Sequence, residues 1–162
     1  MTGTLPDPDA DPDAGADPDA IRKSVTVPLP PARAFDLFTR RMGAWWPTDR
    51  FSVAMFTGGT VARVVVEPRV GGTVHEIAAD GTRADWGRVT RWEPPDTFAM
   101  DWWPGAGPGE ATRLLVRFIG VEAGTRVELT HSGLRERPDG GALVDRYTSG
   151  WDLVLDGLVR AA

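Results

Sequence analysis

Two ionisable side chains, Glu76 and His131, are predicted to face the interior of the protein. Residues 125–131 alternate apolar with polar side chains, which places His131 on one face with Val127 and Leu129. In residues 73–78, Glu76 shares a face with Val74 in the same way. A buried carboxylate and imidazole with shifted pKa values could act as a general acid and base. The commoner alternative is structural, with His131 bound to backbone at a strand end and Glu76 paired with an arginine.

The sequence predicts neither a metal centre nor a covalent nucleophile. His75 and His131 are the only histidines, and His75 is expected to point outward, away from Glu76. A catalytic zinc site usually has three protein ligands, and this chain has no cysteine. Ser132 lacks the strand–turn–helix setting of a nucleophile elbow, and residues 104–109 lack the Gly-Lys-Ser/Thr of a phosphate-binding loop. We therefore expect no metal and no cofactor.

One long helix over residues 139–160 must cover the face that carries these groups. At 1.5 Å per residue it would be roughly 30 Å long, enough to cross a small domain. A lone amphipathic helix has to bury its apolar stripe, and only strands are available to receive it. The apolar positions recur with helical spacing, at Leu143, Val144, Tyr147, Trp151, Val154, Leu155, Leu158 and Val159.

Strand periodicity dominates the remainder of the chain. A first strand is predicted over residues 21–27, and a short helix over 32–41 begins after Pro31, a residue suited to a first helical turn. Six further strands are predicted, over residues 61–67, 73–78, 84–92, 97–103, 112–119 and 125–131. Short turns join them, so they form an antiparallel meander. The predicted fold class is α+β, with one curved antiparallel sheet wrapped around a long C-terminal helix.

The first 20 residues differ in composition from the rest. They hold six Asp, no Lys or Arg, and almost no large apolar side chain. Such a segment cannot bury enough surface to offset the entropy of ordering it, so residues 1–20 are expected to form a disordered acidic tail. Residues 21–162 then form a single domain with 18 basic and 17 acidic residues, although the whole chain carries a net charge of −5. A nearly neutral domain without a basic stripe argues against nucleic acid as a partner.

No targeting or membrane-spanning segment is recognisable. The N-terminal residues lack the positive and apolar regions of a signal peptide. No stretch approaches the roughly 18 apolar residues that a spanning helix needs. We therefore expect a cytoplasmic protein without a membrane span.

Several short motifs resemble those of a known superfamily. The order of one strand, one or two short helices, six strands and a long helix resembles the helix-grip fold of the SRPBCC, or START-like, superfamily. Residues 70–76 (VGGTVHE), 86–89 (WGRV), 92–95 (WEPP) and 129–134 (LTHSGL) resemble its bacterial branch of homologues of the activator of heat-shock-protein ATPase. Residues 45–47 (WWP) and Gly150-Trp151 fit the same branch. The resemblance covers residues 21–161 and implies the fold more strongly than any activity.

The resemblance implies a cavity between the sheet and the final helix. Trp45 and Trp46, beside Pro47, could be a core plug or a gate over the mouth of that cavity. The strand faces and the helix stripe then supply the candidate ligand-binding residues, which are Trp46, Phe56, Glu76, Phe98, Met100, Trp102, Phe118, His131, Tyr147 and Trp151.

Three functional hypotheses follow from the resemblance. The leading hypothesis is a helix-grip protein that binds an apolar or aromatic small molecule and is not an enzyme. The second is a co-chaperone-like module that binds a protein in a stress response. The third is a cyclase- or dehydratase-type enzyme that uses His131 or Glu76 as general acid or base. The sequence leaves the oligomeric state open, a homodimer included.

Overall fold

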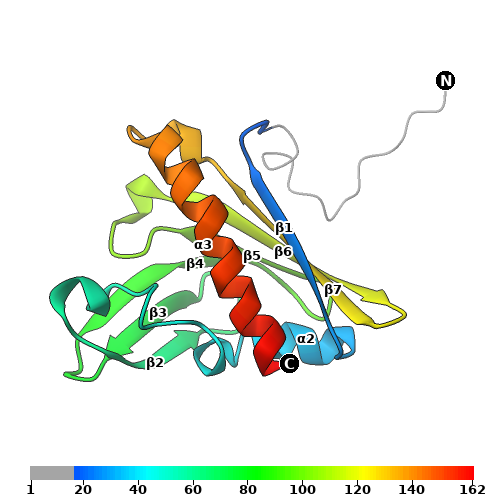
Figure 1. The fold of residues 1–162 in the computed structure, drawn as a ribbon. Coiled ribbons are helices and arrows are strands. Elements are labelled where there is room, and N and C mark those ends of the chain that lie inside the picture. Colours follow the sequence, from blue (N-terminus) through cyan, green and yellow to red (C-terminus); the bar gives the residue numbers. More distant parts are fainter. Residues whose placement is uncertain (1–16) are drawn as a thin grey trace.

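Seven antiparallel strands form one sheet in the order β1-β7-β6-β5-β4-β3-β2, and the long helix α3 lies across it (Figure 1). The computed structural model describes residues 17–162. The strands are β1 (Ile21–Val27), β2 (Val61–Val66), β3 (Thr73–Ala78), β4 (Arg83–Glu93), β5 (Thr97–Trp102), β6 (Thr112–Val121) and β7 (Gly124–Ser132). The helices are α2 (Pro31–Phe38) and α3 (Gly140–Ala161), with short 3₁₀ turns η1 (Met42–Ala44), η2 (Ala54–Thr57), η3 (Pro108–Glu110) and η4 (Leu134–Glu136). The predicted helix-grip α+β fold is confirmed.

Irregular pairing curls the sheet around the helix. The register shifts between Val61 and Arg63 in β2, between Val74 and His75 in β3, and between Val89 and Arg91 in β4. Each such irregularity bends a strand and increases its local twist. The half of the sheet formed by β2–β5 therefore turns toward α3.

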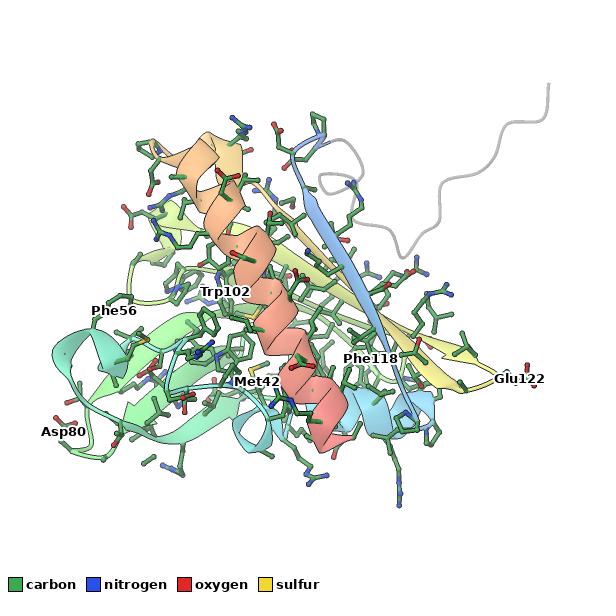
Figure 2. The ribbon with its side chains drawn as sticks, in the orientation of Figure 1. Met42, Phe56, Asp80, Trp102, Phe118 and Glu122 are labelled. Atoms are coloured by element: carbon green, nitrogen blue, oxygen red, sulfur yellow. The ribbon has the colours of Figure 1, made fainter. Side chains whose placement is uncertain are left out.

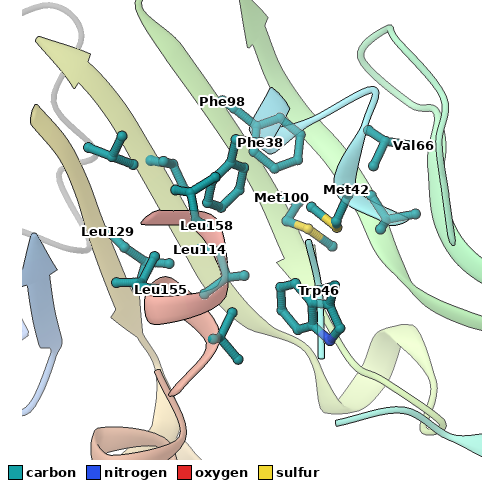
Figure 3. Packing of buried hydrophobic residues seen from close by; sticks show 14 of the residues in the cluster. Phe38, Met42, Trp46, Val66, Phe98, Met100, Leu114, Leu129, Leu155 and Leu158 are labelled. Carbon is teal, nitrogen blue, oxygen red and sulfur yellow. The ribbon is translucent and has the colours of Figure 1, made fainter. Parts of the chain in front are cut away.

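α3 buries its stripe unevenly along its length. Trp151, Val154, Leu155 and Leu158 are almost completely buried, whereas the predicted stripe residue Val159 is 38% exposed. Toward the C-terminal end of α3, Leu155 and Leu158 lie near Leu114, Leu129, Phe38 and Phe98 (Figure 3). The space between helix and sheet is filled by side chains at this end.

Two glycines permit close backbone approaches that position the interior. A Cβ on Gly157 of α3 would lie 2.7 Å from the Trp45 carbonyl oxygen, so only glycine lets the helix lie this close to the segment after η1. A Cβ on Gly87 of β4 would lie 1.8 Å from the Asp101 carbonyl oxygen. Gly87 therefore lets β4 press against β5 directly beside Trp102, its partner in the ladder.

Two local predictions differ from the structure. The predicted helix 32–41 ends at Phe38, where the Thr39 hydroxyl donates to the Phe35 carbonyl and breaks the regular pattern. His75 lies on the opposite side of β3 from Glu76, as expected, but it is 5% exposed and bonds the Thr73 hydroxyl at 2.9 Å instead of facing solvent.

Most of the predicted acidic tail, residues 1–16, lies outside the described residues. Residues 17–20 are described, and they contact the far end of β7. The Asp17 carboxylate accepts a hydrogen bond from the Gly133 N–H at 2.9 Å, and Asp19 lies 3.4 Å from Arg135. This bond to Gly133 is the main reason that the pKa of Asp17 lies below its usual value.

Within residues 17–162, no helix is long and apolar enough to cross a membrane.

Candidate functional site

A cavity of about 350 Å³ lies between α3 and the sheet, toward the N-terminal end of the helix. Its walls come from residues 139–154, the end of β5, and two segments near residues 50–56 and 103–110. Pockets for small molecules commonly measure about 300–1,000 Å³ and are mostly apolar. The cavity falls within this range. Figure 2 shows Trp102 between sheet and helix, and Phe56 on the loop beyond.

Four tryptophans from four separate segments form one aromatic wall of the cavity. Trp46 contacts Trp86, Trp102 and Trp151, with ring centroids 5.0, 5.8 and 5.8 Å apart. Trp102 also lies 5.8 Å from both Trp86 and Trp151. The rings are tilted or edge-on to one another, an arrangement that stabilises aromatic clusters. The wall is therefore a preformed aromatic surface that joins loop, sheet and helix.

The Trp46 and Trp86 indoles are fixed by hydrogen bonds into the protein. Trp46 Nε1–H donates to the Phe51 carbonyl oxygen at 2.8 Å, and Trp86 Nε1–H donates to Glu76 Oε1 at 2.7 Å. The Trp86 bond tethers the sheet side of the wall to Glu76, whereas the Trp46 bond tethers the η1 side to the loop that follows it. Both residues line the cavity, and neither has an indole N–H group left for a ligand.

Glu76 is a structural anchor for the loop at the cavity mouth. Its carboxylate accepts hydrogen bonds from the Val53 and Ala54 N–H groups at 2.6 and 2.9 Å, in addition to the Trp86 indole. The side chain is 1% exposed and does not line the cavity. Its partners are N–H groups, not the arginine considered as an alternative. Because three donors converge on two oxygens, the carboxylate fixes η2 relative to β3 and β4.

His131 lies behind the wall as a neutral imidazole. The Trp151 indole can only donate, so its 3.0 Å bond to Nδ1 makes that nitrogen the acceptor. The proton is therefore on Nε2, which donates to Thr112 Oγ1 at 2.7 Å. Burial lowers the pKa of His131 to about 3, because a charged ring would lose its hydration there. The partners of His131 are side chains of β6 and α3, not the backbone considered as an alternative.

The structure brings half of the candidate ligand-binding residues together. Trp46, Phe56, Trp102, Tyr147 and Trp151 line the cavity, with Phe56 84% exposed at its rim. The remaining five do not line it, namely Glu76, Phe98, Met100, Phe118 and His131.

Phe98, Met100 and Phe118 belong to the filled core. Each is 3% exposed or less, and Figure 3 shows Phe98 near Phe38 and Met100 near Met42. Their strand faces were predicted, but strand alternation says nothing about how far along the helix the cavity extends. The open space begins only where Trp102 ends β5.

Several lining residues were not anticipated from the sequence. Trp86 and Trp103 add aromatic surface, and Thr112 connects His131 to the cavity through its hydroxyl. Trp86 directly precedes Gly87 in the sequence. A glycine inside a strand often marks a close approach of two backbones, so this glycine was the signal that could have drawn attention to Trp86. Register irregularity in β3 and β4 hid the inward face of Trp86 from simple alternation.

Charged side chains surround the cavity mouth. Arg137 donates to the Glu110 carbonyl oxygen at 2.7 Å and lies 3.6 Å from its carboxylate. Arg50 and Arg146 also line the cavity, and among the described residues they form no ion pair. Within residues 17–162, no group of three or more His, Asp or Glu side chains is placed to hold a metal ion.

Comparisons with solved structures support the fold. The anthrahydroquino-γ-pyrone synthase Txn09 is 29% identical, with a TM-score of 0.60, and the alignment covers 90% of this chain and 98% of that one. The Aha1 dimer from Colwellia psychrerythraea is 20% identical, with a TM-score of 0.63 and coverage of 88% and 94%. The AHSA1-like protein from Aeromonas hydrophila is 18% identical, with a TM-score of 0.62 and coverage of 88% and 90%.

Comparison with curated protein sequences gave no significant match. A family model gives the assignment instead. The model described as Activator of Hsp90 ATPase homolog 1-like protein matches residues 28–162, from the end of β1 through α3. The match covers most of the chain and includes every element of the cavity wall, and the SRPBCC-type relationship indicated by the sequence motifs is confirmed. The chain belongs to the family of Activator of Hsp90 ATPase homolog 1-like proteins.

Proposed function

We propose that this protein binds a planar aromatic small molecule in the cavity between α3 and the sheet. The observation that carries the proposal is the wall of Trp46, Trp86, Trp102 and Trp151, which faces a volume of about 350 Å³. Flat aromatic ligands gain most from such a wall because ring faces and edges attract one another. A ligand burying most of its surface there can reach micromolar affinity, which corresponds to about −8 kcal/mol.

The similarity to Txn09 supports an aromatic ligand of several rings. That protein is named as a synthase of an anthrahydroquino-γ-pyrone, which is a polycyclic aromatic compound. At 29% identity over 90% of this chain, the two proteins share more sequence than the other solved structures described above. The wall of four tryptophans is suited to the same class of compound.

The geometry favours ligand binding alone, with no acid–base chemistry carried out by Glu76 or His131. All hydrogen-bonding atoms of the His131 ring are occupied, and the Glu76 carboxylate accepts three hydrogen bonds. Neither side chain reaches the cavity. A cyclase or dehydratase step through either residue would first require these bonds to break.

Two of the five exposed large apolar residues in the described part of the chain lie at the cavity rim. Phe56 is 84% exposed and Met55 is 36% exposed, and both lie on the loop at the cavity rim. Val70, another exposed apolar residue, lies in the turn between β2 and β3 and does not line the cavity. The apolar side chains at the rim are therefore placed to cover a ligand in the mouth.

Titration with N-phenyl-1-naphthylamine tests the proposal. We expect micromolar binding, with quenching of tryptophan emission. Gly150→Leu should weaken the binding at least roughly tenfold, because Gly150 lines the cavity opposite Phe51. A Cβ at position 150 meets the Phe51 ring at 3.6 Å, an ordinary contact, so the variant should fold.

Ser149→Leu provides the matched control. Residue 149 precedes the glycine, faces solvent and does not line the cavity, so the same side chain added there should leave the affinity unchanged. Absence of binding to the wild-type protein, or equal loss in both variants, would contradict the proposal.

A further inference from the structure

The Tyr147 hydroxyl differs in its hydrogen bonding from the other polar groups on the tryptophan wall, because it accepts a bond but donates none. Tyr147 projects from α3 and stacks on Trp151, with ring centroids 6.2 Å apart and an angle of 26° between the planes. Its ring also lies nearly perpendicular to that of His131, with ring centroids 4.6 Å apart. The hydroxyl oxygen accepts a hydrogen bond from Trp102 Nε1–H at 3.0 Å. Three aromatic neighbours thus hold the ring in place beside the cavity.

The neighbouring polar groups are already used within the protein. The Trp151 indole donates to His131, and His131 donates in turn to Thr112. The Thr112 hydroxyl can then donate to the Trp102 carbonyl oxygen, 3.3 Å away. None of these groups has a proton left for a ligand.

Tyr147 differs because its oxygen accepts while its own proton has no acceptor among the described residues. The Ser52 hydroxyl and the Trp103 indole also keep a proton without such an acceptor, but among the described residues no hydrogen bond or ring stacking joins either group to Trp102 or Trp151. Of these three groups, only Tyr147 bonds one tryptophan of the wall, Trp102, and stacks on another, Trp151. Tyr147 is half-buried and lines the cavity, so a ligand that covers its hydroxyl must supply an acceptor or leave that donor without a partner, which costs free energy.

We propose that Tyr147 donates a hydrogen bond to a ring carbonyl oxygen, so that the site prefers planar aromatic ketones and quinones to the corresponding hydrocarbons. This inference rests on the proposed function, because it requires the aromatic ligand to lie against the tryptophan wall. The Trp102 N–H bond to the same oxygen orients the hydroxyl and polarises its O–H bond.

The tyrosine keeps its proton under ordinary conditions. Burial raises the pKa of Tyr147 above its usual value, and the Trp102 bond and the nearby Arg146 and Arg137 offset part of that rise. The hydroxyl is thus a neutral donor near pH 7. An ionised phenolate could only accept, and it would repel a carbonyl oxygen.

Two probes with the same three-ring frame and the same sulfonate test the inference: anthraquinone-2-sulfonate carries two ring carbonyl groups, and anthracene-2-sulfonate carries none. Both carry the same sulfonate, which is suited to Arg50 and Arg146 at the mouth. Calorimetric titration of the full chain should give roughly three- to tenfold tighter binding of the quinone. Tyr147→Phe should bring the ratio of the two affinities close to one. Thr148→Val, which removes a hydroxyl from the exposed face of the same helix, should preserve the ratio.

Because the two affinities are compared within one variant, a general loss of stability affects both and does not change their ratio. The infrared carbonyl band of anthraquinone-2-sulfonate bound to the wild-type protein gives a second readout that needs no variant, and a hydrogen bond should shift it to lower frequency. Equal affinities in the wild type, an unchanged ratio in Tyr147→Phe, or an unshifted band would overturn the inference and leave the proposed function standing. Failure of both probes to bind would overturn the two together.

Discussion

At the scale of single residues, His131 and Glu76 are the two side chains best suited to acid–base chemistry, but both are buried and support the cavity structurally. His131 is fully buried and neutral, and it links Trp151 of α3 to Thr112 of β6. Glu76 holds the mouth loop through two backbone N–H groups. Both act on the cavity indirectly, because each fixes a tryptophan of its wall.

The buried His131 should make stability fall below neutral pH. Its pKa is about 3 in the folded protein and near 6.5 when unfolded, so between these values the unfolded chain binds a proton that the folded protein does not. The free energy of unfolding should therefore drop as pH falls from 7.5 to 5, by about 2 kcal/mol from this residue. Urea denaturation at the two pH values measures the drop.

His131→Asn provides the comparison for this measurement. It cannot titrate, so its unfolding free energy should lose about 2 kcal/mol less over the same range. The pKa of His75 is also lowered by burial, but its contribution is present in both proteins and cancels. The lowered pKa values of Asp17, Glu67 and Asp80 act below about pH 5. Equal losses in the two proteins would show that His131 is protonated in the folded state.

At the scale of elements, α3 has two functions along its length. Its last turns seal the core through Leu155 and Leu158, whereas the residues before them form the cavity wall, Tyr147 and Trp151 among them. Helical spacing in the sequence predicted the buried stripe. It could not predict where packing stops, because that depends on how closely Gly157 and Gly87 bring the backbones together.

Adjacent substitutions in α3 test which of its faces is buried. Trp151→Ala should lower the free energy of unfolding by about 3–5 kcal/mol, the usual cost of removing a large buried aromatic side chain. Asp152→Ala should cost no more than about 1 kcal/mol, although Asp152 lies 2.9 Å from Lys23, because the carboxylate is mostly exposed. Urea denaturation compares them, and similar costs would mean that the buried face is wrongly assigned.

Strand alternation and register decide which site residues the sequence could and could not predict. Alternation correctly gave the inward faces of Met100 and Phe118, and those faces proved to be core. Trp86 was missed because an irregular register in β3 and β4 obscures the alternation. The Tyr147–Trp102 bond joins residues 45 positions apart, and only the folded chain shows it.

At the scale of the whole molecule, residues 17–20 contact the end of the sheet through Asp17 and Asp19. Deletion of residues 1–20 should lower the melting temperature by about 2–4 °C, because it removes the Asp17 bond to Gly133 and the Asp19 pair with Arg135. Deletion of residues 1–16 alone should leave it within about 1 °C, since that segment has little apolar surface to bury. Scanning calorimetry of the two truncations decides, and equal melting temperatures would show that the Asp17 contact contributes nothing.

The central claim is that an aromatic ligand occupies the tryptophan-walled cavity, and the seven indole N–H signals of the protein test it directly. In a ¹H–¹⁵N spectrum titrated with N-phenyl-1-naphthylamine, the five tryptophans of the cavity lining should shift, which are Trp46, Trp86, Trp102, Trp103 and Trp151. Trp45 and Trp92 do not line the cavity and should shift least. Saturating shifts confined to those five signals are the predicted result. No saturating shift, or shifts largest at Trp92, would contradict the account.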